Sequence, residues 1–366
     1  MKKSNLYLIV IFLIFLMLNI SSQSVQAVIL GLISVYAFFY WAKIRVINKW
    51  IAFFLLQLIF VLVFSLTKYA NISMYYLISE LKVLVIFTLP IFFNFIFQKT
   101  DGLKLLIQFF KIYSILVFIL GGYGYFVEGL LRYTGFLQHS IYISVTLVLL
   151  SSYLFDFLNN NWKIITIINI LMLGSSSGVL IIVIAYISKL KIAIWKKVIP
   201  SILGAAIIFW YITDYRGREV FGSGFLEIDR VQIFLGIAEY TKSNFNTLNY
   251  LVGYGIGNPL EGFKFVKPFH SFEMIGFANW FSSFTRNGVY PFAFHNEFLR
   301  IFYDFGLIGL FFILKYLYNN LDKIIFIALM LACFTNTILY STSGLFILSM
   351  LVAGKMSNIK KLNNSE

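Results

Sequence analysis

Residues Phe294–Arg300, with the sequence FHNEFLR, join a long polar stretch of this chain to an apolar one. Many of the chain's 15 acidic residues lie in the polar stretch, about 214–296, whereas 301–316 is mostly apolar. His295 is one of only three histidines. A side chain that can exchange a proton near neutral pH, placed where a polar loop enters an apolar helix, predicts the entrance to an active site.

The composition is that of a membrane protein. Hydrophobic residues make up 60% of the chain and charged residues 12%, against about 25% charged in a soluble domain. The net charge of +14 would indicate nucleic acid only if the basic residues formed one patch, but they fall in short clusters between apolar runs. Nucleic acid is therefore not an expected partner. Cys333 is the single cysteine, which excludes a disulfide within the chain and a cysteine-based metal site.

Apolar runs of about 20 residues are long enough to cross a bilayer. They lie at 5–21, 25–42, 50–67, 79–97, 104–126, 139–158, 162–174, 176–189, 197–213, 297–316, 324–339 and 341–354. The sequence thus predicts an all-α polytopic membrane protein with about twelve transmembrane helices. Nine lie in 1–213, a large loop spans 214–296, and 297–366 holds the last three helices and a tail. The short runs 162–174 and 176–189 are two helices or one re-entrant hairpin.

The first residues allow two interpretations. Residues 1–27 carry two lysines, an apolar run and a small-residue end, as a signal peptide does. An uncleaved first transmembrane helix is the alternative, and we favour it because another apolar run begins at once.

Basic residues predict the orientation. They gather on the side of the N-terminus, as in 43–49, 189–197 and 355–361, while the short loops on the other side hold Lys68 and Arg132. The positive-inside rule then puts both termini in the cytoplasm and the 214–296 loop outside. Within that loop, Val231–Tyr240 is expected to be a helix.

A polar stripe follows His295. On a helix that starts near Asn296, Glu297, Arg300 and Asp304 share one face. Charges inside a membrane helix must face a cavity or another helix. They are either part of the functional site or a structural ion pair of Arg300 with one of the two acids. Gly306 and Gly309 would allow a neighbouring helix to approach closely.

Arginines form a second candidate group. Arg216 and Arg218 open the loop, and Arg230 begins its expected helix. Arginine forks match phosphate oxygens, so we expect at least one of the three to bind an anion. Surface ion pairs with nearby acids are the alternative. Arg132, on a short outer loop, is either an interfacial anchor or a fourth member of this group.

Two further patterns carry less weight. Gly253–Asn258 (GYGIGN) follows no strand of a βαβ unit, so a tight loop is expected rather than a dinucleotide site. Glu227 and Asp229 are too few ligands to predict a metal site. No metal and no cofactor is therefore expected.

The motifs together resemble those of O-antigen polymerases (Wzy type) and O-antigen ligases. Phe294–Leu299, followed by DFGLIGL at 304–310, resembles their His-Asn…Glu-x-Gly-x-x-Gly signature. Arg132-x-x-Gly135 and Arg230 with the 253–257 glycines resemble their outer-loop motifs. The resemblance spans about 130–350. One departure is Ser176-Ser177-Gly178, where the family often has Ser-Arg-Gly.

The resemblance implies a membrane glycosyltransferase of a GT-C-like fold, at the periplasmic face of the bacterial inner membrane. Its donor and acceptor would be glycans on undecaprenyl diphosphate, and a flippase and a chain-length regulator would be partners. Arg230, with Arg216 or Arg218, would stabilise the diphosphate, and His295 would orient or deprotonate the acceptor hydroxyl. Arg132, Asn296, Glu297 and Arg300 would help to bind substrate.

Three functions follow as hypotheses. An O-antigen polymerase is the first. The strong bias of the chain toward Phe, Ile, Asn and Lys, and a large loop with its own unusual sequence, are typical of an enzyme that acts on one particular glycan. A ligase that transfers glycan to the lipid A core is the second. A polysaccharide flippase or exporter is a third, favoured only by Glu80 and Lys82 in the fourth run.

Overall fold

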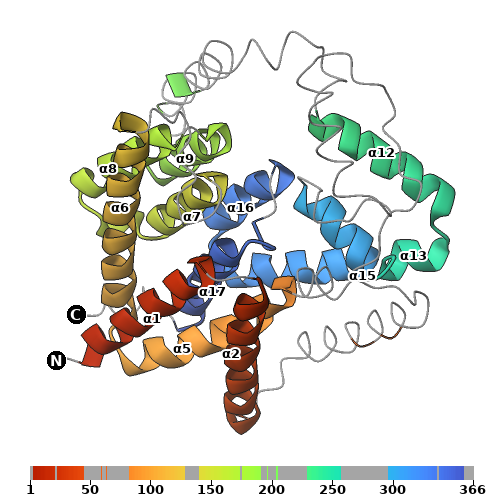
Figure 1. The fold of residues 1–366 in the computed structure, drawn as a ribbon, viewed down its shortest axis with the longest axis horizontal. Coiled ribbons are helices and arrows are strands. Elements are labelled where there is room, and N and C mark those ends of the chain that lie inside the picture. The colour runs from red at the N-terminus through yellow and green to blue at the C-terminus, as the bar shows by residue number, and fades with distance from the viewer. Residues whose placement is uncertain are drawn as a thin grey trace.

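Helices make up all the regular structure that the computed structural model describes (Figure 1). The structure describes residues 3–20, 23–44, 59, 63, 82–127, 140–173, 175–190, 196, 203–204, 229–256, 296–335 and 338–357. No strand occurs in these ranges, so the expected all-α class is confirmed for them. The predicted runs 50–67 and 197–213 lie almost wholly outside the described residues.

The helices follow the apolar runs closely. They are α1 (Lys3–Ile20), α2 (Gln23–Ile44), η1 (Lys82–Phe87), α5 (Leu89–Lys99), α6 (Gly102–Phe126), α7 (Ser140–Tyr153), η2 (Phe155–Phe157), α8 (Asn160–Met172), α9 (Ser176–Lys189), α12 (Asp229–Asn244), α13 (Thr247–Val252), α15 (Glu297–Asn320), α16 (Lys323–Thr335) and α17 (Thr342–Met356). The helix expected over Val231–Tyr240 is confirmed as α12.

Local chemistry explains where several helices start. The side chains of Asp101, Asn159, Ser175 and Ser341 each accept a hydrogen bond from the backbone N–H three residues later. Ser175 thereby begins α9 as a helix separate from α8; two crossing helices and one re-entrant hairpin would both contain these two helices. The predicted run 79–97 is divided into η1 and α5, because Pro90 lies in the first turn of α5 and tolerates only a helix start.

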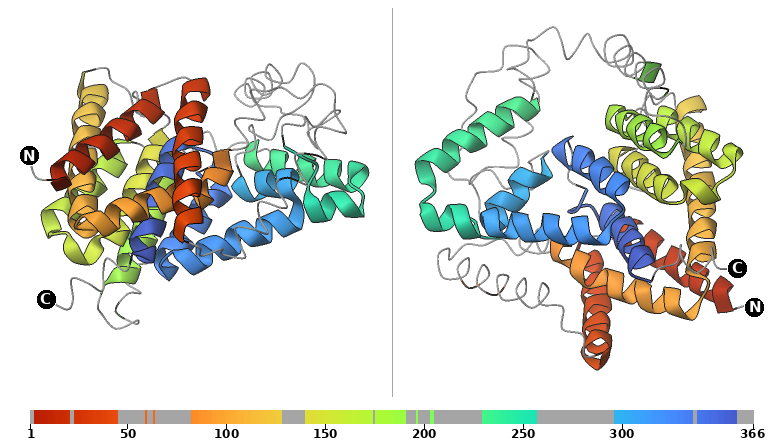
Figure 2. Two further views of the ribbon diagram at one scale, coloured as in Figure 1. Left: turned by 90° about the horizontal axis from the view of Figure 1, so that it is seen from below. Right: turned by 180° about the vertical axis from the view of Figure 1, so that it is seen from behind.

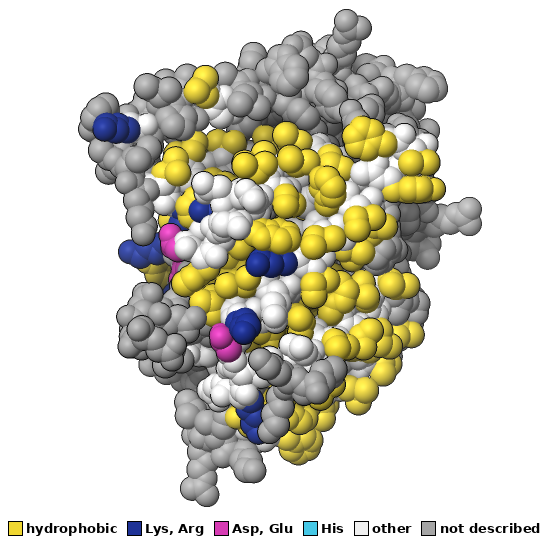
Figure 3. All heavy atoms as spheres, turned by 90° about the vertical axis from the view of Figure 1, so that its left-hand side faces the viewer, with side chains coloured by type: hydrophobic (Ala, Val, Ile, Leu, Met, Phe, Trp, Pro, Cys, Tyr) yellow, Lys and Arg dark blue, Asp and Glu magenta, His cyan; other side chains and the backbone are white. Residues whose placement is uncertain are grey.

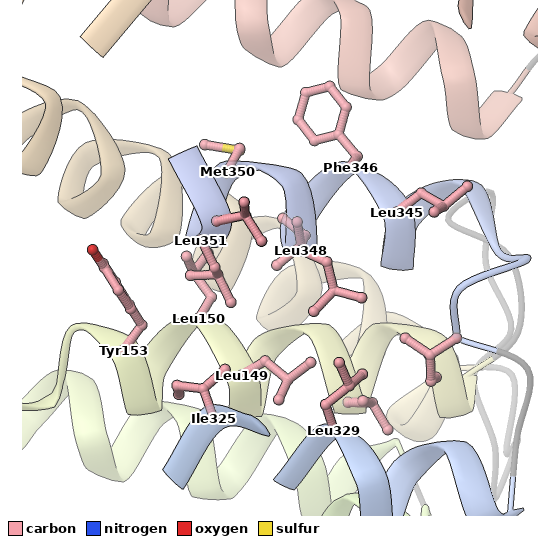
Figure 4. Packing of buried hydrophobic residues seen from close by; sticks show 14 of the residues in the cluster. Leu149, Leu150, Tyr153, Ile325, Leu329, Leu345, Phe346, Leu348, Met350 and Leu351 are labelled. Atoms are coloured by element: carbon pink, nitrogen blue, oxygen red, sulfur yellow. The ribbon is translucent and has the colours of Figure 1, made fainter. Parts of the chain in front are cut away.

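Helix α17 is the centre of the bundle. Its side chains are buried from Thr342 to Gly354, and it packs against α1, α5, α6, α7 and α15. Figure 4 shows Leu348 and Leu351 of α17 on the side of Leu149 and Leu150 of α7, while Phe346 and Met350 point the other way. A helix that is apolar on all sides is expected to be enclosed by others. Small residues bring the helices close: a Cβ on Gly354 would lie 2.7 Å from the Tyr153 hydroxyl oxygen.

The outer surface is apolar. Long side chains of α1 and α2 are widely exposed, such as Leu32 at 67% and Phe39 at 69%, and Figure 3 shows hydrophobic side chains over much of one face. Meanwhile Ser144, Thr146 and Ser151 of α7 are fully buried. Among the described residues, two helical segments, Lys82–Lys99 and Gly102–Gly124, have the length and composition needed to cross a membrane.

Helices α12, α13 and the first half of α15 form a group beside the bundle (Figures 1 and 2). The group packs around its own hydrophobic cluster of Ile233, Ile237, Tyr240, Phe245 and Tyr303. Residues 229–256 of the predicted loop therefore share a hydrophobic core with the first half of α15.

Candidate functional site

The described residues include only part of the predicted site. Asn296, Glu297 and Arg300 lie at the start of α15, and residue 230 lies in the first turn of α12. The remaining predicted site residues lie outside the described residues: Arg132, Arg216, Arg218 and His295. Their roles stay predictions, as do those of the three residues in α15.

Asn296 fixes the start of α15. Its Oδ1 accepts a hydrogen bond from the Leu299 N–H at 3.1 Å, the usual geometry of an N-terminal cap. Its Nδ2 donates to the carbonyl oxygen of Phe334, near the end of α16, at 3.2 Å. The residue that follows His295 is thus held by both helices.

The polar stripe of α15 is buried against the link between α16 and α17. Glu297 and Asp304 have no exposed area and Arg300 is 3% exposed. Glu297 Oε1 accepts from the Tyr340 N–H at 3.0 Å and Oε2 from the Cys333 thiol at 3.3 Å. The expectation that this stripe faces another part of the protein is confirmed.

Tyr340 contacts the other two charged residues as well. Its hydroxyl donates to Asp304 Oδ2 at 2.8 Å, and the guanidinium carbon of Arg300 lies 3.6 Å from the centre of its ring. Arg300 also acts electrostatically on Glu297. We call Glu297, Arg300, Asp304 and Tyr340 the Tyr340 cluster. Sequence reasoning gave neither Cys333 nor Tyr340 a place in the site, because Cys333 is a lone cysteine and Tyr340, one of 23 tyrosines, belongs to no motif.

Helix α15 is broken at Gly306, two residues after the cluster. Gly306 has φ 66° and ψ −170°, which only glycine adopts readily. A Cβ there would lie 2.4 Å from the carbonyl oxygen of Leu251, and a Cβ on Gly253 (φ 92°) would lie 2.4 Å from that of Asp304. Gly306 had been expected to allow a membrane helix to approach; its neighbour is the end of α13.

The glycine turn after α13 fills the break. The N–H of Tyr254 donates to the Tyr303 carbonyl oxygen at 2.7 Å, a group that an unbroken helix would pair with Leu307. The tight loop expected at Gly253–Asn258 is confirmed for residues 253–256, with Gly253 and Gly255 at positive φ. The two glycine motifs of the sequence therefore meet backbone to backbone. We call this contact the glycine interlock.

Aromatic packing holds α12 beside α15. The ring of Phe245 stacks on that of Tyr254, with centroids 5.4 Å apart and planes at 5°, and also packs on Phe302 and Tyr303. In Figure 1, and from behind in the right-hand view of Figure 2, the first turns of α12 and α15 lie at the same end of this group.

A second buried polar group lies on the other side of the α16–α17 link. Lys82 Nζ donates to Gln26 Oε1 at 2.8 Å, and the Thr342 hydroxyl donates to the same oxygen at 2.9 Å. All three side chains are buried. Lys82, which favoured a transporter by its position in an apolar run, is hydrogen-bonded in the helix bundle; Glu80 lies outside the described residues.

Within the described residues, no group of three or more His, Cys, Asp or Glu side chains is close enough to hold a metal ion. Glu227 lies outside them, and for Asp229 only the backbone is described.

Comparison of the chain with protein-family models, curated proteins and solved structures gives no match.

Proposed function

We propose that the protein is a polytopic membrane glycosyltransferase, an O-antigen polymerase that joins repeat units carried on undecaprenyl diphosphate. The apolar outer surface and the buried Ser, Thr, Lys, Glu, Arg and Asp side chains support the membrane part. A soluble monomer rarely exposes contiguous apolar patches beyond a few hundred Å², whereas lipid solvates such a surface and drives polar groups inward.

One observation carries the catalytic part of the proposal. The first turn of α12, with residue 230, and the start of α15, next to residue 295, lie at one end of a group held by aromatic packing and the glycine interlock. An arginine and a histidine carried by two helix starts at one end of the same group suit a transfer reaction that needs an anion-binding group and a base. Helix N-termini also favour negatively charged ligands.

The proposed reaction is a displacement at the anomeric carbon of the donor. The acceptor hydroxyl oxygen forms the new bond to that carbon, and the bond from the carbon to the diphosphate oxygen breaks. His295 takes the hydroxyl proton. Arg230, with Arg216 or Arg218, stabilises the charge that develops on the undecaprenyl diphosphate leaving group. Arg132 and Asn296 are proposed to help position the substrates.

Alanine variants of the two central residues test this proposal. We expect Arg230→Ala and His295→Ala to abolish long glycan chains at normal protein levels, with His295→Ala losing about 10²- to 10⁴-fold in rate. Lys242→Ala is the matched control, since Lys242 is an exposed base in the last turn of α12. Long chains in either variant, at normal abundance, would show that the assignment is wrong.

A gene deletion followed by glycan gels separates the three functions. A core that carries a single repeat unit identifies a polymerase. A bare core together with long lipid-linked chains identifies a ligase, which remains the second candidate because the motifs are shared. Absence of repeat units from the outer face identifies a flippase.

Topology is a separate prediction. A reporter fused near Asn258, just after the glycine turn, is expected to be active only outside the cytoplasm, and one fused after Met356 only inside. The reverse pattern for the Asn258 fusion would place the loop in the cytoplasm and exclude a periplasmic transferase.

A further inference from the structure

Tyr340 contacts every charged side chain of the first half of α15. Its backbone N–H donates to Glu297, its hydroxyl donates to Asp304, and its ring lies under the guanidinium of Arg300. The three partners are at positions 297, 300 and 304, so the contacts extend over two helical turns. Tyr340, in the α16–α17 link, therefore contacts one face of α15 at three positions along the helix axis.

These contacts restrict the movements available to α15. A hydrogen bond to a buried carboxylate is short-ranged and directional, and it is stronger away from water. A guanidinium is attracted to the face of an aromatic ring only within about 6 Å. Sliding α15 along its axis or turning it about that axis would weaken several of these contacts together. Tyr340 thus restrains the height and rotation of the first two turns, together with the Asn296 hydrogen bond to Phe334.

We propose that Tyr340 is a positioning residue of the transfer site: through Glu297, Arg300 and Asp304 it restrains the start of α15 at Asn296, the residue bonded to His295. The inference rests on the proposed function for the role of His295, whereas the restraint on α15 stands on the contacts alone. Tyr340 itself touches neither substrate nor the reacting atoms in this assignment.

The reason that position matters is the short reach of proton transfer. A general base must lie about 2.6–3.2 Å from the oxygen whose proton it takes, and a misplacement of about 1 Å can cost roughly 10²-fold in rate. Residue 295 directly precedes the cap of α15. The first turn of α15 is thus the described part of the chain nearest in sequence to His295.

The test is Tyr340→Phe, which keeps the ring for Arg300 and the N–H for Glu297 and removes only the hydroxyl. Tyr316→Phe is the control, because Tyr316 is a buried tyrosine of α15 that packs on Phe87 with ring centroids 4.6 Å apart, outside the Tyr340 cluster. We expect kcat to fall about tenfold or more for Tyr340→Phe, with KM for the donor nearly unchanged. The control should keep both values.

Hydrogen exchange supplies a readout that does not need activity. Tyr340→Phe is expected to speed exchange at the amides of 297–304 and not in α6 or α7, whereas Tyr316→Phe leaves 297–304 as in the natural protein. Asp304→Ala, which removes the acceptor of the Tyr340 hydroxyl, should give the same pattern, and the double variant should cost less than the sum of the two single changes. If Tyr340→Phe fails to accumulate, Asp304→Ala alone decides.

The outcomes separate the two proposals. Unchanged exchange at 297–304 together with unchanged kcat would overturn the role of Tyr340, and so would a loss of kcat matched by the control. A different result is faster exchange in Tyr340→Phe while the natural protein forms no glycosidic bond. The restraint of α15 by Tyr340 would then stand, but the transfer site, and with it the positioning role, would be overturned.

Discussion

Replacing Glu297 by alanine is expected to lower stability by about 1–3 kcal/mol for each buried donor that loses its acceptor. The change removes the carboxylate that accepts from the Tyr340 N–H and the Cys333 thiol. The purified variant in detergent should melt at a clearly lower temperature, and its level in membranes should fall.

Two further variants make this prediction specific. Glu297→Gln keeps an oxygen that can accept from the Tyr340 N–H, so its melting temperature should lie between those of the natural protein and Glu297→Ala. Glu239→Ala removes an exposed acid of α12 and should leave the melting temperature unchanged within error. Equal melting temperatures for Glu297→Ala and Glu239→Ala would show that Glu297 does not hold the cluster together.

Replacing Gly306 by alanine is expected to open the glycine interlock. The backbone conformation of residue 306 alone costs a non-glycine residue about 1–3 kcal/mol. The added Cβ also meets the carbonyl group of Leu251 at 2.4 Å, so α13 must move away from α15. Limited proteolysis should then cut the 229–256 region faster, and under the proposed function glycan synthesis should be lost, because α12 and α13 no longer keep their place against α15.

Gly31→Ala is the control for this change. Gly31 lies within α2, and a Cβ there meets nothing within 4 Å. Alanine in an open helical position is neutral or slightly stabilising, so the control should resist protease as the natural protein does. If Gly306→Ala resisted protease equally well, the interlock would not be what holds the loop helices in place.

Much of the helical architecture could be predicted from the apolar runs, since each run must be a helix if it is to satisfy its backbone in lipid. The capping residues are local as well. The polar stripe at 297, 300 and 304 predicted that some partner must lie opposite it. The partner itself could not be predicted. Tyr340 lies 43 residues from Glu297, and the polarity of one helix face does not show which distant segment packs against it.

Gly306 shows a different limit. The stripe was derived for a continuous helix, in which Gly306 was only a small residue suited to close packing. The structure uses its backbone freedom instead. A positive φ at one glycine depends on what approaches it, here the Gly253 turn, and two glycine motifs some fifty residues apart give no local sign that they meet.

The enclosed position of α17 has a consequence for assembly. This helix follows α1, α5, α6, α7 and α15 in the chain and packs against all of them. During synthesis, the faces of these helices that pack on α17 stay uncovered until α17 has been made. A chain that ends before Thr342 therefore lacks the helix that fills the middle of the bundle.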